Sequence, residues 1–274
     1  MLEFLLAALA PMNRTRVKQL LRSGRVVVNG TPTTRHDHPV RPSDAVILAR
    51  AAPPPSAEQL GVTVVFEDAH LVVIDKPSGL LTVATESEKL DTAFVRLSGY
   101  LASRGGGRPF VVHRLDRDTS GLLLFARSAG VRDHLQEHWE DVTKTYFAVV
   151  EGQPRPAEGV VDNFLTEGRD LRVRASDRPG KDAKRAVSRY KVLEARGRYS
   201  FVEVELETGR KHQIRVHMAG LGCPVAGDEL YGATTDPARR LCLHARKLAF
   251  EHPFTGERLE AESPTPQALR RGID

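Results

Sequence analysis

The stretch from Phe110 to Arg127, FVVHRLDRDTSGLLLFAR, is the feature that most constrains how this chain can fold. Its apolar runs are short, rich in Val, Leu and Phe, and separated by Asp-Thr-Ser-Gly turn chemistry, which predicts two buried strands joined by a tight loop. Between the runs lie five ionisable residues, His113, Arg114, Asp116, Arg117 and Asp118. Charges beside a core are costly unless paired, so these side chains must satisfy one another or a ligand. A purely structural salt-bridge loop is the plain alternative.

The rest of residues 61–274 alternates between predicted strands and a few helices. Residues 168–184 are rich in Arg, Lys, Asp and Gly and predict a charged, projecting hairpin or loop. Many strands with a few interspersed helices favour an α+β domain built around a large, mostly antiparallel sheet. The pattern predicts strands over 62–66, 71–74, 145–150, 201–206 and in a pair within 241–260, and helices over 91–101, 129–140 and 211–220.

Residues 1–50 carry the net charge of the chain. They hold eight Lys or Arg against three acids, a net of +5, which equals the formal charge of all 274 residues. Helical spacing over 2–10 and 14–23 is followed by Val-Val-Val-Asn-Gly, a strand and hairpin turn, and by a second short strand within 41–50. This order resembles the small α-L RNA-binding fold of a ribosomal small-subunit protein. The resemblance implies phosphate contacts from one helix face, which carries Arg14, Lys18 and Arg22.

A stretch rich in proline follows, AAPPPSAE from Ala51 to Glu58. Consecutive prolines predict a semi-extended linker. We therefore expect an RNA-binding domain over residues 1–50, a linker over 51–60 and a second, larger domain over 61–274.

Composition narrows the class of protein further. No apolar run approaches the roughly 20 residues that span a bilayer, so we expect no membrane segment and a cytoplasmic protein. The two cysteines, Cys223 and Cys242, form no C-x-x-C motif and predict small buried residues rather than a zinc site. A monomer is the default expectation.

Several segments together carry a family resemblance. HRLDRDTSGL, beginning at His113, resembles the active-site motif of the RluA-type pseudouridine synthases. GRKHQIRVHM, beginning at Gly209, is similar to the second signature of that family, and KPSG at 76–79, KTY at 144–146 and GDELYG at 227–232 match further segments in the expected order. The resemblance covers roughly residues 61 to 260 and implies the pseudouridine synthase fold.

The resemblance also assigns roles to residues. It implies that Asp116 is the nucleophile of uridine isomerisation, that Arg215 is its ion-pair partner and that Tyr146 stacks on the target base. A cation beside Asp116 is physically needed, because burial alone would raise the pKa of a carboxyl group. Covalent attack and proton abstraction with elimination both remain open for Asp116.

The remaining site residues are expected to face or support the RNA. A uridine in folded RNA must be flipped out of the stack, and the resemblance implies that Arg114 enters its place. No cofactor and no metal are implied. RNA-facing or supporting groups are expected at His113, Lys76, Arg210 and Lys211.

Two other classes of function compete with this interpretation. A non-catalytic RNA-binding or ribosome-assembly factor would have no need for a buried carboxylate paired with arginine. A carboxylate-based glycoside hydrolase would need a second catalytic acid, which the motifs do not supply. The target is expected to be ribosomal RNA rather than transfer RNA, because an appended basic domain suits a large structured substrate.

Overall fold

The computed structural model describes residues 1–22, 25–33, 35–49, 60–86, 88–168, 170 and 172–271. The last residue of the helix expected over 14–23 and almost all of the expected linker, residues 51–59, lie outside these ranges.

The N-terminal elements form a small unit with its own core. Two helices, α1 (Leu2–Ala8) and α2 (Arg14–Arg22), accompany a three-stranded antiparallel sheet in the order β2 (Thr31–Thr33), β1 (Val26–Val28), β3 (Val46–Leu48). Val17, with no exposed surface, and Leu5 pack together in the core of this unit. Asn29 and Gly30 both have positive φ, of 50° and 83°, as a tight hairpin turn between β1 and β2 requires. The predicted helices and hairpin are thus confirmed.

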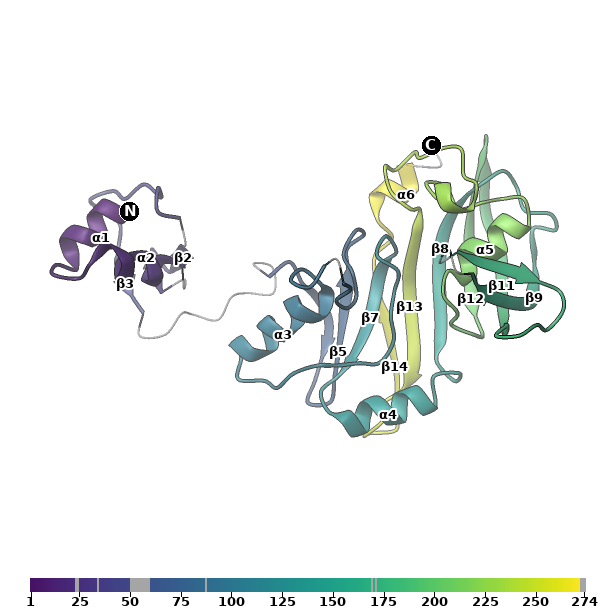
Figure 1. Cartoon of the computed structure of the whole chain (residues 1–274), viewed down its shortest axis with the longest axis horizontal. Coiled ribbons are helices and arrows are strands. Elements are labelled where there is room, and N and C mark those ends of the chain that lie inside the picture. Colours follow the sequence, from purple (N-terminus) through teal and green to yellow (C-terminus); the bar gives the residue numbers. More distant parts are fainter. Residues whose placement is uncertain are drawn as a thin grey trace.

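The larger unit is built on one eleven-stranded sheet (Figure 1). Its strand order is β10-β9-β11-β12-β8-β13-β7-β5-β4, with β14 paired to β13 and β6 paired to β7. Among the strand pairings described, β7 with β13 is parallel and the others are antiparallel. The strands are β4 (Thr63–Glu67), β5 (Leu71–Lys76), β6 (Phe110–Val111), β7 (Ser120–Ala126), β8 (Thr143–Glu151), β9 (Glu158–Glu167), β10 (Val173–Ser176), β11 (Lys184–Arg196), β12 (Tyr199–Leu206), β13 (Leu243–Glu251) and β14 (Arg258–Glu262).

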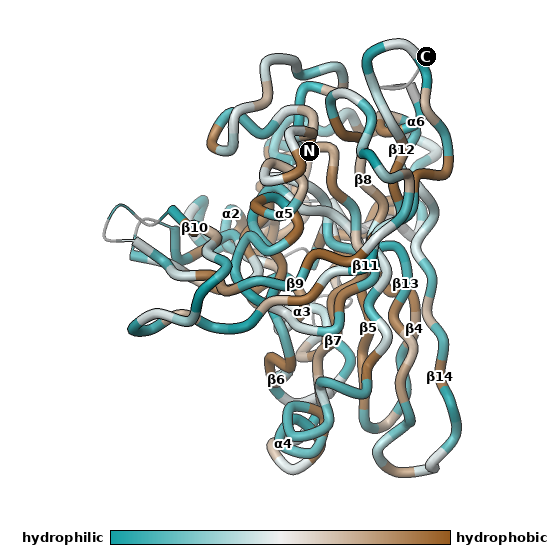
Figure 2. The backbone as a smooth tube through the Cα atoms, turned by 90° about the vertical axis from the view of Figure 1, so that its right-hand side faces the viewer, coloured by the Kyte–Doolittle hydropathy of each residue, from teal (hydrophilic) through white to brown (hydrophobic). Residues whose placement is uncertain are grey.

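Helices cover both faces of this sheet. They are α3 (Ala93–Ser103), α4 (Ala129–Glu137), α5 (Gln213–Gly220) and α6 (Gln267–Arg271), with one 3₁₀ turn, η1 (Glu229–Tyr231). Alternate residues of β7 face opposite ways: Leu123 packs in the core that includes α3 and α5, and Leu124 packs in the core that includes α4. Hydrophobic residues are frequent along central strands such as β5 and β7, whereas the residues of α4 are largely hydrophilic (Figure 2). All seven residues of β7 are buried, so the loop before it leads directly into the buried part of the sheet.

The predicted α+β architecture around a mostly antiparallel sheet is confirmed. Each of the three helices expected in this unit is present within three residues of its predicted ends. Two long strands, β9 and β11, were not predicted, and the expected charged hairpin is the connection from β9 through β10 to β11. The connection between β6 and β7 is longer than the predicted tight loop and spans residues 112–119. Arg169 and Leu171 lie outside the described residues.

Candidate active site

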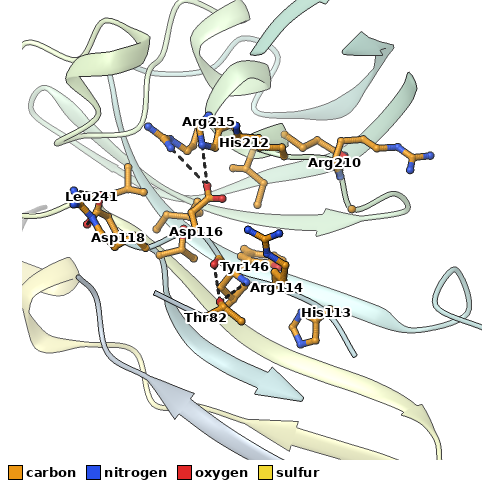
Figure 3. Close-up of a pocket in the computed structure, with 18 of the residues that line it drawn as sticks. Thr82, His113, Arg114, Asp116, Asp118, Tyr146, Arg210, His212, Arg215 and Leu241 are labelled. Carbon is orange, nitrogen blue, oxygen red and sulfur yellow. Dashed lines mark hydrogen bonds and ion pairs between the residues drawn. The ribbon is translucent and has the colours of Figure 1, made fainter. Parts of the chain in front are cut away.

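A cavity of about 1160 Å³ opens between the loop before β7 and the start of α5. Figure 3 shows Asp116 near its centre, with Arg215 and His212 on one side and Tyr146 and Arg114 on the other. These side chains come from four separate segments: the loop over 112–119, strand β8, the turn over 208–212 and helix α5. The sheet brings together residues that the sequence spaces up to a hundred positions apart.

Asp116 lies in a loop whose backbone is fixed by the segment after β5. Thr82 Oγ1 donates to the carbonyl of Leu115 at 2.8 Å and accepts from its N–H at 3.1 Å. The carbonyl of Arg117 accepts from the Gly79 N–H at 2.9 Å. Backbone groups on both sides of Asp116 are therefore held, which restricts where its carboxylate can point.

Lys76 supports this loop and does not face RNA. Its side chain is fully buried, and Nζ donates to three backbone carbonyls, those of Pro77 at 3.0 Å, Leu80 at 2.7 Å and Arg117 at 3.0 Å. Burial lowers the pKa of Lys76 to about 7, although the charges of Asp118 and Asp116 act in the opposite direction. Of the two roles expected for Lys76, facing the RNA or supporting the site, these contacts fit the supporting one, because its three hydrogen bonds are made inside the protein.

His113 is likewise a supporting group. Its Nε2 accepts a hydrogen bond from the Leu124 N–H at 3.0 Å, and its ring stacks on Trp139 with the centroids 4.6 Å apart. Burial lowers the pKa of His113 to about 3, with a smaller effect from Lys144, so the ring is neutral. Of the two roles expected for His113, facing the RNA or supporting the site, these contacts fit the supporting one, since the acceptor nitrogen is already used.

Arg215 contacts Asp116 as expected, but its main partner is a different acid. Its Nη1 lies 3.6 Å from Asp116 Oδ2, whereas Nε and Nη2 donate to the two oxygens of Asp228 at 2.6 and 2.7 Å. The side chain of Asp228 is 1% exposed and that of Asp116 is 29% exposed. Burial opposes the charge of Arg215, but the hydrogen bonds and charge of Asp228, followed by the charge of Asp116, raise the pKa of the guanidinium. Arg215 is a permanent cation held beside the accessible carboxylate.

Tyr146 closes the cavity from the sheet side. It lies on β8, between Val204 of β12 and Ala245 of β13, and is 9% exposed. Burial raises the pKa of the Tyr146 phenol, and the charge of Asp116 adds to this effect. The ring therefore presents an apolar face with a protonated hydroxyl group, which suits stacking on a base.

The exposed cations lie at the rim of the cavity. Arg114 and Arg210 both line it and are exposed, and Arg210 Nε donates to the carbonyl of Arg185 at 3.0 Å. Lys211, also at the rim, contacts Glu167. Arg14 and Lys18 are exposed on α2 in the N-terminal unit, where Arg14 lies 3.4 Å from Glu3. The side chain of Arg22 lies outside what the structure describes.

Two residues of the site were missed by the sequence reasoning. Asp228 and His212 both fall inside motifs that match the family, but no role was predicted for either residue from the sequence. A signal for Asp228 existed, because a partly buried arginine needs an acid and GDELYG supplies one. His212 carried no such signal, since its position depends on a left-handed backbone with φ 54° and ψ 18°.

Among the described residues, no cluster of three or more His, Cys, Asp or Glu side chains is arranged to hold a metal ion. No helix in the described part of the chain is long and apolar enough to cross a membrane. Cys223 and Cys242 are free and buried, as expected.

Known proteins resemble this chain in both sequence and fold. Residues 70–220 match the family described as RNA pseudouridylate synthase. An uncharacterised RNA pseudouridine synthase of Bacillus subtilis, YlyB, is 35% identical over 284 residues, covering 99% of this chain and 92% of the relative. Ribosomal large subunit pseudouridine synthase D of Zymomonas mobilis is 30% identical, covering 94% of this chain and 88% of the relative. The structure of human RNA pseudouridylate synthase domain-containing protein 4 superposes with a TM-score of 0.66 at 27% identity, covering 79% of this chain and 94% of the human chain.

Proposed function

We propose that this chain, which belongs to the RNA pseudouridylate synthase family, converts specific uridines of structured RNA to pseudouridine through Asp116. The chain is thus an isomerase acting on RNA. The observation that carries the proposal is the unequal pairing of two acids with Arg215. Asp228 takes both short hydrogen bonds, and Asp116 keeps a cation at 3.6 Å while remaining open to the cavity.

The reaction needs what this arrangement offers. The bond between N1 of uracil and C1′ of ribose breaks, the base turns, and a bond from C5 to C1′ forms. C5 loses a proton and N1 gains one, so the composition and the oxidation state are unchanged. An ionised carboxylate can attack the nucleoside covalently or abstract a proton to start an elimination, and both routes begin from the charged Asp116. Arg215 places a positive charge 3.6 Å from the carboxylate without occupying it by a short hydrogen bond.

Access to the cavity requires the uridine to leave the RNA stack. Flipping a base costs a few kcal/mol, and the cost is lower when another planar group fills the gap. Arg114 is exposed at the cavity rim and carries a planar guanidinium, so we assign it this task. Arg210 and Lys211 are proposed to bind the flanking phosphates.

The N-terminal unit is proposed to be an α-L RNA-binding domain over residues 1–50 that adds affinity through phosphate contacts. Exposed Arg14 and Lys18 on α2 support this. We favour large-subunit ribosomal RNA over transfer RNA as substrate, in line with the name of the Zymomonas relative, and a cytoplasmic, monomeric enzyme.

The test is carbodiimide-based mapping of pseudouridine on unmodified ribosomal and transfer RNA. Wild-type protein should add new marks, and Asp116→Asn should add none while binding RNA with the same affinity. Marks made by a clean Asp116→Asn preparation would contradict the assigned nucleophile. Binding without marks by both proteins would favour an RNA-binding assembly factor.

The role of α2 has a separate test in the full-length chain. Lys18→Glu should weaken RNA binding and reduce the slope of log K against log salt by about one, because a phosphate contact is lost. Arg258→Glu on β14, another exposed cation, is the matched control. Equal slopes for both variants would mean that the α2 face does not touch RNA.

A further inference from the structure

His212 occupies a backbone conformation that side chains rarely adopt. It precedes α5 with φ 54° and ψ 18°, in the left-handed region that favours glycine. Its neighbour Gln213 is anchored on both sides: Oε1 accepts from Thr208 Oγ1 at 2.8 Å, and Nε2 donates to the carbonyl of Val187 at 2.9 Å. Strained conformations of this kind persist where the surroundings fix them, and they concentrate at functional sites.

The imidazole of His212 is oriented by Tyr231. The two side chains are joined by a hydrogen bond of 2.8 Å between Nδ1 and the phenol oxygen. That oxygen already accepts from the Val173 N–H at 3.1 Å, and no other acceptor for the phenol proton is found in the described part of the chain. The phenol therefore donates to Nδ1, which places the imidazole proton on Nε2.

The Nε2–H group points at the reacting centre and has no hydrogen-bond partner among the residues that the structure describes. It lies 3.8 Å from Asp116 Oδ2, too far for a hydrogen bond, and the His212 side chain lines the cavity with 13% of its surface exposed. Figure 3 shows His212 beside Arg215 on the same side of Asp116. A substrate atom that contacts the Asp116 carboxylate from the cavity therefore lies within reach of the His212 Nε2–H donor.

Arg215, on the same wall, is less available as a donor. Arg215 gives Nε and Nη2 to Asp228, and its remaining Nη1 faces Asp116. Burial lowers the pKa of His212, and although Asp116 raises it, the charges of Arg215 and Lys211 lower it again. A neutral imidazole can donate a hydrogen bond here without forming an ion pair that would occupy Asp116.

We propose that His212 is a catalytic residue whose Nε2–H donates a hydrogen bond to a carbonyl oxygen of the uracil ring as the bond between N1 and C1′ breaks. The electron pair of that bond passes to the uracil and spreads over N1, O2 and O4. When the bond from C5 to C1′ forms, the ring supplies the electron pair, C5 then loses its proton to solvent, and N1 takes a proton from solvent. His212 transfers no proton in this step, because it stabilises charge by position alone. The proposal rests on the proposed function and assigns one more residue to it.

Substitutions at His212 separate catalysis from structure. In single-turnover assays with saturating enzyme and an RNA that the wild type modifies, His212→Gly should slow pseudouridine formation by on the order of 10²–10³-fold. The dissociation constant for RNA should not change, and the melting temperature should stay the same or rise, because glycine adopts positive φ without strain. His212→Gln keeps a side-chain N–H donor and should recover part of the rate.

Sulfur substitution in the RNA tests the hydrogen bond itself, because sulfur is a poorer acceptor than oxygen. RNA with 2-thiouridine or 4-thiouridine at the target should slow the wild type at one of the two positions, and His212→Gly should be insensitive to that same change. Equal thio effects in both proteins, an unchanged rate for His212→Gly, or a rate loss matched by lost stability or RNA affinity would overturn the proposal. Absence of marks from the wild type on every RNA would instead overturn the proposed function.

Discussion

Replacing Asp228 by Asn should damage both stability and catalysis, because Asp228 holds Arg215. The two side chains are 1% and 12% exposed and share two hydrogen bonds of 2.6 and 2.7 Å. Asparagine keeps the shape but removes the buried countercharge, which leaves the guanidinium with only the more distant charge of Asp116. Removing one partner of a buried pair costs about 3–5 kcal/mol of unfolding free energy. Urea denaturation followed by the fluorescence of Trp139, the one tryptophan of the chain, measures this cost in the larger unit.

Asp162→Asn is a matched control for this prediction. Asp162 forms the same two-point contact with Arg185, at 2.9 and 2.5 Å, but the side chains are 43% and 62% exposed. Loss of an exposed pair should cost about 0–1 kcal/mol. Equal costs for the two variants would refute the argument that burial gives the Asp228 pair its weight.

The catalytic effect of Asp228→Asn is a second readout on the same protein. Without Asp228, the guanidinium of Arg215 is free to move from 3.6 Å into a close pair with Asp116. We expect the single-turnover rate to fall at least about tenfold, equivalent to about 1.4 kcal/mol, at temperatures where the variant remains folded. A folded variant with the wild-type rate would show that Asp228 acts on stability alone.

Three further predictions follow from buried groups. Lys76→Met leaves three buried carbonyls without their donor, so the single-turnover rate should fall while the RNA dissociation constant stays constant, and an unchanged rate would contradict the supporting role. Gly121→Ala should cost about 3–5 kcal/mol in urea unfolding, because φ is +111° and an added Cβ would lie 2.2 Å from a backbone oxygen of β13, whereas Gly232→Ala, with φ +93° and open space, should cost about 1–2 kcal/mol. Burial lowers the pKa values of His217 and His244 to about 4, so below pH 6.5 the unfolded chain binds protons that the folded chain does not. The free energy of unfolding should therefore decrease as the pH is lowered, by about 2 kcal/mol per histidine between pH 7 and 5. A urea midpoint that stays constant over that range would contradict the two pKa values.

Sequence reasoning located the parts of this fold that local patterns encode. The strands on either side of HRLDRD were predictable because short Val, Leu and Phe runs next to turn residues have few other interpretations. Helix α3 was predictable from its apolar spacing. The strands β9 and β11 were not, because they carry many charged residues and have exposed positions along much of their length. Their stability depends on pairing with neighbours far along the chain, which no local pattern reports.

The site was predictable in its residues but not in its pairings. The family motifs brought Asp116, Tyr146 and Arg215 to attention, and the structure places all three around one cavity. The roles of Lys76 and His113 could not be read from the sequence, because a charged or polar residue beside a catalytic motif is equally consistent with a surface contact and with a buried support. The distinction depends on which backbone carbonyls and N–H groups lie within 3 Å in the folded protein.

The division of Arg215 between two acids explains how one arginine can serve both the fold and the reaction. A carboxylate that accepts two short hydrogen bonds from a guanidinium is well stabilised but poorly available for attack, as for Asp228. At 3.6 Å, the charge of Arg215 still acts on Asp116, because Coulomb attraction declines slowly with distance, whereas the hydrogen bond is lost. Asp116 thus has a cation nearby while its side chain stays 29% exposed. Asp228 holds the guanidinium of Arg215 in place, so Asp116 does not need to bind it closely. We therefore predict that the distance between Arg215 and Asp116, more than the presence of the arginine, sets the reactivity of the Asp116 carboxylate.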